Sequence, residues 1–334
     1  MPASHIDHAD LAAHAKGKVN ISSEEAATRR TQVNHLRTRL ESYIAAHPDY
    51  DLVKLRASGS TAKHTAIRRR KGEGSDADVA AYVRAANVGG VDADESGLLT
   101  WLKDRCMEVY GATKVAEDFT ISDHAVGITM HGSGLKIDVA PVLYTGEPDD
   151  RGYLVTRQGD RVLTSVTLHL SFMTTRRTAA GANYRELIRL LKAWIREAKR
   201  NDDQLRCKSF LLELLVAHLW DNGWNGEPLR VNNYPQAIEQ VLSYVVRTEL
   251  LTPISFTDFY AIGEIKATSD PIQVWDPVNP ANNVTRTYTE TDRQRLVKAA
   301  TTALEDIAWA TQAPTKGDAN DAWRNVLGPS FGGA

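Results

Sequence analysis

The stretch from residue 57 to 83, ASGSTAKHTAIRRRKGEGSDADVAAYV, decides the fold class of this chain. It predicts a strand that ends at Gly59-Ser60, a short helical piece, a basic turn, and a second strand that the acidic triplet at 76–78 opens. A glycine after a strand lets the backbone approach a ligand closely, and the free N–H groups at the start of a following helix can bind phosphate. The Ser60 hydroxyl can add a further donor. This order indicates a mixed α and β core that binds a phosphorylated ligand.

Three carboxylates are predicted to meet beside that loop. Asp76 and Asp78 are two residues apart at the start of a strand, so both point to one face of the sheet. Asp138 lies in SGLKIDVAPVL (133–143), where apolar residues occupy the alternate positions. If the two strands are neighbours, the carboxylates could hold two Mg²⁺ ions roughly 3.5–4 Å apart. The alternative is that Asp76 caps a turn and that Asp138 is an ordinary exposed strand residue.

The flanking sequence predicts two domains. Helical spacing after Ser22 and Ser23, two N-cap candidates, indicates one long helix that ends at His47-Pro48. The segments that follow read as strands at 52–56, 78–84, 125–131 and 135–143, with a helix near 98–110. Later segments with helical periodicity are 182–200, 208–223, 234–250 and 289–310.

We therefore expect an α+β fold with a flexible arm over 1–21, a core over 22–160 and a helical domain over 161–334. The segment Gly152–Gly159 is the candidate hinge between the two domains. A cleft between two such domains is a usual place for a ligand, so we expect the active site there.

Composition excludes several classes of protein. The chain has 334 residues, 42% hydrophobic and 25% charged, which is typical of a globular protein. Its formal net charge of −2 provides no global attraction for nucleic acid or anionic lipid. Cys106 and Cys207 are too few for a disulfide scaffold or a cysteine-based zinc site. Without an apolar run near the ~18 residues of a membrane span, or a signal-peptide core, we expect a soluble cytoplasmic protein.

The motifs together resemble a known family. The glycine-serine loop, the DxD triplet and the later lone aspartate resemble the nucleotidyltransferase fold of DNA polymerase β-like enzymes. YRELIRLLKAWIRE (184–197), KSFLLELLVAHLWDNG (208–223) and IQVWDPVNPANNV (272–284) are similar to the C-terminal domain of oligoadenylate synthases. In this order they look most like a bacterial CD-NTase, one of the cGAS/DncV-like nucleotidyltransferases of CBASS anti-phage defence, and most like clade C. The resemblance runs from about Ser22 to the C-terminus.

The resemblance implies a Mg²⁺-dependent enzyme that makes a cyclic oligoadenylate second messenger from ATP, with cyclic tri-AMP as the first expectation. It also implies control by a HORMA-domain partner, an AAA+ remodelling ATPase and non-specific DNA as a further candidate activator. Two alternatives stay open. One is a linear oligoadenylate synthase or another polymerase β-like nucleotidyltransferase, and the other is a catalytically idle binding module.

The family's site residues carry over where this sequence matches its motifs. The metal ligands would be Asp76, Asp78 and Asp138, holding two Mg²⁺ ions, with Mn²⁺ as an alternative metal. Asp138 would also act as the base for the acceptor hydroxyl. The residues that hold the donor triphosphate would be Gly59, Ser60, Lys192 and Ser209.

Other interpretations of these residues stay open. Lys192 lies at the edge of a buried helical arc, where a lysine often extends its ammonium to solvent. Ser209 could cap a helix that begins at Phe210, and Phe210 itself fits a core position better than a base-stacking one. The basic run at 68–71 could be a solvated turn or a contact for phosphate or nucleic acid. The segment 276–284, DPVNPANNV, is expected to shape a loop rather than to carry chemistry.

Overall fold

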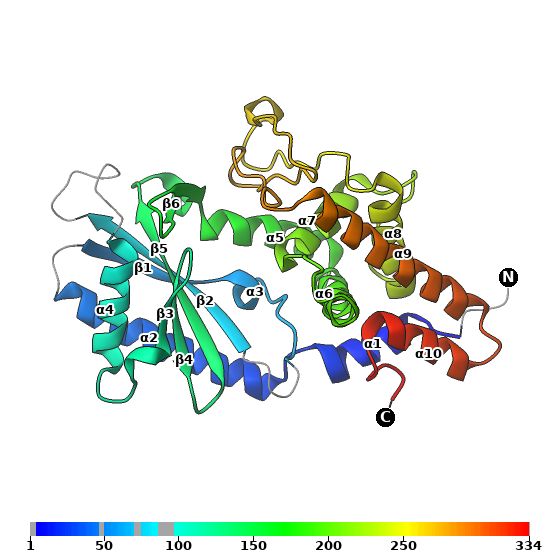
Figure 1. Ribbon diagram of the computed structural model, residues 1–334, viewed down its shortest axis with the longest axis horizontal. Helices are drawn as coiled ribbons and strands as arrows, with labels where there is room; N and C mark the ends of the chain where they lie inside the picture. The colour runs from blue at the N-terminus through cyan, green and yellow to red at the C-terminus, as the bar shows by residue number, and fades with distance from the viewer. Residues whose placement is uncertain (1–4, 47–49, 70–74, 86–96, 334) are drawn as a thin grey trace. The chain divides into compact units, whose positions relative to one another are not determined.

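The computed structural model describes residues 5–46, 50–69, 75–85 and 97–333 (Figure 1). Ile21–Ser171 form one unit, which contains the sheet, and Met1–Asn20 together with Phe172–Ala334 form a second, helical unit. The division falls inside helix α5 (Val166–Ala180). The predicted α+β fold is confirmed, and the two units are described in turn.

A mixed sheet forms the centre of the first unit (Figure 1). Within the described residues it has seven strands, and the main path runs β1-β2-β5-β4-β3. β2 and β5 pair parallel, while β1 pairs antiparallel with β2. The strands are β1 (Tyr50–Ser58), β2 (Ser75–Ala85), β3 (Phe119–Ile121), β4 (Val126–Met130), β5 (Leu135–Tyr144), β6 (Gly152–Val155) and β7 (Arg161–Thr164).

The two faces of the sheet have different surroundings because successive side chains of a strand point to opposite sides. On one face, Ala77, Val79 and Val83 of β2 belong to a large apolar core with buried residues of α2 (Ser23–Ala45) and α4 (Leu98–Tyr110). On the other face, Tyr82 belongs to a smaller apolar cluster, and its hydroxyl accepts a hydrogen bond from the Val166 N–H at 3.0 Å. The acidic residues of β2 lie on this second face.

Helix α2 begins where its capping signal predicts. The Ser22 hydroxyl accepts a hydrogen bond from the Glu25 backbone N–H at 3.1 Å, which satisfies one free donor of the first turn. The predicted stop at His47-Pro48 lies outside the described residues.

The segment predicted as a hinge contains regular structure instead. Residues of β6 pair with β5 and β7, so the hairpin that spans Gly152–Thr164 extends the sheet. The Thr156 hydroxyl accepts hydrogen bonds from the N–H groups of Gln158 and Asp160, which builds the turn of this hairpin. The glycines therefore belong to a β-hairpin and do not form a linker.

The helical unit contains, beyond part of α5, five long helices in the described residues: α6 (Asn183–Asn201), α7 (Ser209–Asn222), α8 (Tyr234–Thr248), α9 (Glu290–Gln312) and α10 (Lys316–Leu327). Every residue of α7 from Leu211 to Ala217 is buried, so α7 is the central helix of this unit. The unit also contains the short helical turn η4 (Ile262–Glu264), whereas η2 (Ala116–Asp118) and η3 (Pro148–Asp150) belong to the sheet unit. No helix in the described ranges has both the length and the hydropathy to cross a bilayer.

The first 21 residues were expected to form a flexible arm, and the structure differs here. Asp7 caps a short helix, α1 (His8–His14), which continues into the π turn η1 (Ala15–Val19). Ile6, Leu11 and Val19 are at most 1% exposed. The segment is ordered because these apolar side chains are buried in the helical unit.

Candidate active site

The structure brings two of the predicted metal ligands into register. Asp78 on β2 lies directly opposite Asp138 on the neighbouring parallel strand β5. Asp76 is two residues earlier on β2 and therefore shares their face of the sheet. Asp76, Asp78 and Asp138 are all partly exposed, whereas Ala77 between the first two is buried in the core. The predicted convergence of strands is confirmed, while the roles of the three side chains remain a prediction.

Gly59 is required by the position of Asp78. Its φ of +62° lies in the left-handed region, and a Cβ atom at this position would lie 1.8 Å from Asp78 Oδ2. The backbone after β1 therefore packs directly against the carboxylate. The close approach of this glycine to a bound phosphate, which the sequence predicts, stays a prediction. The following residue, Ser60, accepts hydrogen bonds through its carbonyl from the N–H groups of Thr65 and Ala66 at 2.9 and 3.1 Å.

A second glycine, which the sequence analysis did not identify, packs against Asp138. Gly127 on β4 is the antiparallel partner of Asp138, and a Cβ atom here would lie 2.9 Å from Asp138 Oδ1 and 2.4 Å from Lys136 Cε. The signal in the sequence was a lone glycine inside an apolar strand, which often marks a close approach.

Basic side chains neutralise two of the carboxylates in this structure. Arg69 forms an ion pair with Asp76. Lys136 Nζ lies 3.1 Å from Asp138 Oδ1, a buried oxygen that makes no well-oriented hydrogen bond within the described residues. Across the described ranges, no group of three acidic, histidine or cysteine side chains has a geometry that could hold a metal ion.

The donor set nevertheless fits a hard divalent cation. Carboxylate oxygens are the ligands that Mg²⁺ prefers, and it needs only one or two of them beside substrate phosphates. The two glycines add no side-chain atoms of their own beside Asp78 and Asp138. For a metal ion to bind here, Arg69 would have to release Asp76, and Lys136 would have to release Asp138.

Lys192 does not extend to solvent. It is 5% exposed, and its ammonium lies 2.7 Å from Oε1 of Glu213, which is 2% exposed. The alternative of a lysine that reaches solvent is therefore wrong, because the charge is buried beside an opposite charge on α7. The predicted contact with a triphosphate is not tested by this arrangement.

Ser209 is the first residue of α7, so it does not cap a helix that begins at Phe210. Lys208 occupies the cap position, and no side chain caps this helix terminus. Ser209 is exposed, as is Lys208. Lys192 and Ser209 belong to the helical unit and the three aspartates to the sheet unit, so a site shared by both sets stays a prediction.

The basic run at 68–71 is described only in part. Arg68 and Arg69 lie within the described residues, and Arg70 and Lys71 lie outside them. The pairing of Arg69 with Asp76 links this run to the acidic face of the sheet.

The sequence of the chain is similar to those of known oligonucleotide synthases. Residues 8–160 match the Second Messenger Oligonucleotide or Dinucleotide Synthetase domain, and residues 151–325 match the C-terminal domain 2 of 2'-5'-oligoadenylate synthetase 1. The chain is 39% identical over 334 residues to a cyclic AMP-AMP-AMP synthase of Escherichia coli (strain MS 115-1), with all of both chains covered. It is 28% identical over 317 residues to a CBASS oligonucleotide cyclase CdnC of E. coli (strain KTE188), with 94% of this chain and 93% of that protein covered.

Solved structures show the same likeness. CdnC of E. coli MS115-1 with ATP superposes with a TM-score of 0.86 at 38% identity, covering 98% of this chain and 100% of that one. A complex of the same protein with HORMA-deltaN gives a TM-score of 0.85 at 39% identity, covering 98% and 99%.

Proposed function

The chain belongs to the CD-NTase family, the nucleotidyltransferases of CBASS, within clade C, and on that premise we propose that it joins ATP units into cyclic tri-AMP. The observation that carries the proposal is the 39% identity, over the full length of both chains, to a cyclic AMP-AMP-AMP synthase. The register of Asp78 with Asp138 supports it, because an idle binding module has no need of opposed carboxylates.

We propose that Asp76, Asp78 and Asp138 hold two divalent ions, Mg²⁺ or alternatively Mn²⁺. When bound, these ions supply charge neutralisation to the triphosphate and to the acceptor hydroxyl. Asp138 accepts the proton of that hydroxyl as its oxygen attacks the α-phosphorus of the donor ATP. One P–O bond forms, the bond to pyrophosphate breaks, and the last transfer of this kind closes the ring.

The nucleotide residues have separate tasks in this proposal. Gly59 and Ser60 bind the donor triphosphate through the close backbone approach at the end of β1. Lys192 and Ser209 contact the same triphosphate. The Lys192 ammonium, which is paired with Glu213 in the structure, then contacts both Glu213 and a phosphate oxygen. Most of the rate enhancement would come from positioning and charge neutralisation, because phosphoryl-type transfer needs little covalent chemistry from the protein.

Product analysis tests this proposal. The protein is incubated with mixed ribonucleoside triphosphates and Mg²⁺, and the products are treated with phosphatase and identified by mass spectrometry. We expect cyclic tri-AMP that phosphatase does not alter. A product that loses terminal phosphates would identify a linear oligoadenylate synthase, and no product under any activating condition would favour the binding module.

We further propose a HORMA-domain protein as the regulatory partner, on the basis of the relative that was solved with HORMA-deltaN. An AAA+ remodelling ATPase that releases this partner and non-specific DNA bound at residues 68–71 complete the proposed control. A pull-down with the HORMA protein, followed by product formation with and without it, tests the first of these proposals. Binding without any change in product formation would contradict it.

A further inference from the structure

Lys136 is a basic residue within the acidic face of the sheet, and the proposed reaction gives it no task. It lies on β5 directly opposite Asp76 of β2, and two residues before Asp138. Because successive side chains of a strand alternate, Lys136 shares one face of the sheet with both carboxylates. On its other side β5 pairs with β4, where Thr129 is the partner of Lys136 (Figure 1). The position of Lys136 in the sheet therefore places it within the candidate metal site.

The side chain of Lys136 folds back along its own strand to Asp138. Its Nζ lies 3.1 Å from Asp138 Oδ1, the buried oxygen that makes no well-oriented hydrogen bond within the described residues. Gly127 on β4 provides the space for this conformation, because a Cβ atom there would overlap Lys136 Cε. The ammonium therefore lies beside the oxygen that Asp138 would offer to a metal ion.

The simpler alternative is an ordinary surface ion pair, which contributes little to stability. The burial of Asp138 Oδ1 and the glycine beneath the lysine stem argue against it, since a solvated pair needs neither. An ammonium and a divalent ion compete for the same carboxylate oxygen, and at contact distance their positive charges repel each other. The pair is thus well suited to oppose the binding of a metal ion.

The charges on this face indicate what would release Lys136. Three carboxylates, those of Asp76, Asp78 and Asp138, face the two positive charges of Arg69 and Lys136. This leaves one net negative charge among these residues, which is little for two divalent ions. A nucleoside triphosphate brings the missing negative charge, and its phosphate oxygens accept the hydrogen bonds of a lysine ammonium. Binding of the triphosphate therefore gives Lys136 an alternative partner.

We propose that Lys136 is a positioning residue that holds Asp138 in the empty enzyme and opposes the binding of divalent metal until a nucleoside triphosphate draws its ammonium away. The proposal rests on the proposed function, which assigns Asp138 to the metal and the triphosphate to the donor ATP. It makes the binding of metal and of nucleotide mutually dependent, and such coupling is the same in both directions.

The first test measures Mn²⁺ binding without nucleotide, from the electron paramagnetic resonance signal of free Mn²⁺. Lys136→Met should bind Mn²⁺ about 10-fold more tightly than wild type, because the competing charge is gone. Lys136→Gln should behave in the same way, whereas Lys136→Arg keeps the charge and should bind as weakly as wild type. Asp138→Asn combined with Lys136→Met should lose the gain, because Lys136 acts through Asp138. Lys298→Met, at an exposed position of α9, is the matched control and should match wild type.

The second test measures coupling with α,β-methylene ATP, an analogue that cannot release pyrophosphate. Its affinity is measured by calorimetry with and without Mn²⁺, and complexes between Mn²⁺ and the analogue in solution are the same for every variant. Mn²⁺ should raise the affinity of wild type, and the increase should be about 10-fold smaller in Lys136→Met.

Equal Mn²⁺ affinity of wild type and Lys136→Met without nucleotide would overturn the proposal, as would an equal increase in analogue affinity. Weaker Mn²⁺ binding by Lys136→Met would give the lysine a purely structural role and would also overturn it. If wild type then still made cyclic product, the proposed function would stand without this inference. Absence of Mn²⁺ binding in every variant, with or without the analogue, would contradict the proposed metal site and this proposal together.

Discussion

At the scale of single residues, the acidic face of the sheet depends on two glycines that have no side chain. Gly59 and Gly127 lie against the carboxylates of Asp78 and Asp138, and in both places a Cβ atom would overlap the neighbouring side chain. The carboxylates are therefore positioned by backbone on one side and by the strand that carries them on the other. Small displacements of reacting groups cost much activity, so both glycines should matter to the reaction.

Gly59→Ala tests this requirement. The new methyl group would strain the backbone at φ +62° and push Asp78 Oδ2 away, so we expect at least about a 100-fold loss of product formation. The matched control is Gly134→Ala, because Gly134 has a φ of +66° with no atom within 4 Å of the added Cβ. Both variants should lose about 1–2 kcal/mol of stability from the left-handed backbone, measured by thermal or denaturant unfolding. Equal activity of the two variants would contradict the role of the Asp78 contact.

A test of the role of Lys192 requires a double variant, because Glu213 is buried beside it. Lys192→Ala alone would leave an uncompensated buried charge and cost about 3–5 kcal/mol of stability. Lys192→Met combined with Glu213→Gln should recover most of that loss, measured by denaturant unfolding. If Lys192 contacts the triphosphate, the double variant should still show a raised KM for ATP. A wild-type KM in the double variant would leave Lys192 with a structural role alone.

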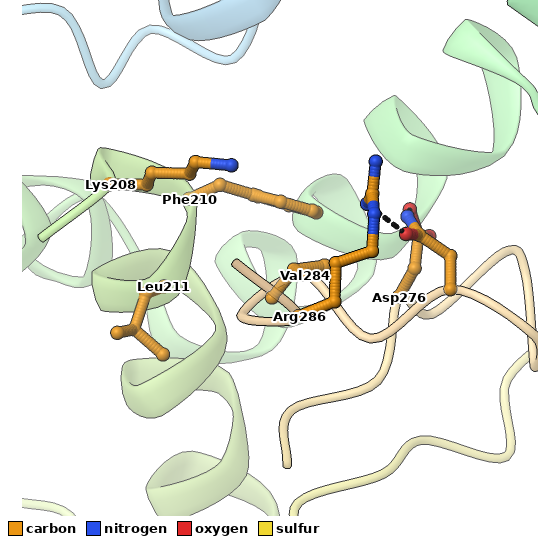
Figure 2. Close-up of a pocket in the computed structure, with 7 residues that line it drawn as sticks. Lys208, Phe210, Leu211, Asp276, Val284 and Arg286 are labelled. Carbon is orange, nitrogen blue, oxygen red and sulfur yellow. Dashed lines mark hydrogen bonds between the residues drawn. The ribbon is translucent and has the colours of Figure 1, made fainter. Parts of the chain in front are cut away.

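These residues also mark how far the sequence determines the candidate site. Two-residue periodicity was enough to place Asp76 and Asp78 on one face, and alternation with apolar residues did the same for Asp138. The partner of Lys192 could not be predicted, because Glu213 lies on another helix and the pair forms only through tertiary packing. A cavity beside Phe210 could not be predicted for the same reason, since residues 208–211 and residues 276–286 line it together (Figure 2).

At the scale of elements, long and strongly patterned segments were predicted well. The helix expected near 98–110 is α4 (Leu98–Tyr110), and the strand expected at 135–143 is β5 (Leu135–Tyr144). Short elements were missed: the hairpin of β6 and β7, and helix α1. A strand of four residues has too little alternation to be recognised, and α1 depends on a capping box and on burial against distant helices.

The ordered N-terminal segment makes a pH-dependent contribution to stability. His14 is 7% exposed at the end of α1, and desolvation, then Lys18 and Arg196, lowers its pKa from the usual 6.5 to about 4. The folded state therefore favours the neutral ring, so this stability is complete above pH 6.5 and is lost as the pH falls toward 4. The difference corresponds to about 3 kcal/mol.

We expect His14→Gln to flatten the fall in unfolding free energy between pH 7 and pH 4.5, measured by denaturant unfolding at several pH values. The slope with pH is the quantity to compare, because the substitution itself changes packing against Phe331. His5→Gln, at an exposed position, is the control and should keep the slope of wild type. An unchanged slope in His14→Gln would show that His14 titrates normally in the folded protein.

At the scale of the whole molecule, electrostatics restricts how a polyanion could act on this enzyme. A formal charge of −2 gives no overall attraction, so any DNA activator must bind through a local group of positive charges. The run at 68–71 provides such a group, but Arg69 contacts Asp76 and so also belongs to the acidic face. A variant that changes all of these residues would mix an effect on DNA with an effect on the metal ligands.

The variant Arg68→Glu with Arg70→Glu separates the two effects, because it leaves Arg69 on Asp76. If DNA binds this run, its affinity for wild type should be insensitive to sequence and should fall steeply between 50 and 200 mM salt. The slope of log affinity against log salt should become shallower by about one for each phosphate contact that the variant loses. Stimulation of product formation by duplex DNA should then disappear while basal activity stays, since Arg69 keeps its ion pair with Asp76. Arg30→Glu with Arg247→Glu makes the same change in net charge at two exposed positions and should keep the stimulation. Equal loss of stimulation in both double variants would mean that DNA responds to net charge alone, and the run at 68–71 would then be a solvated turn.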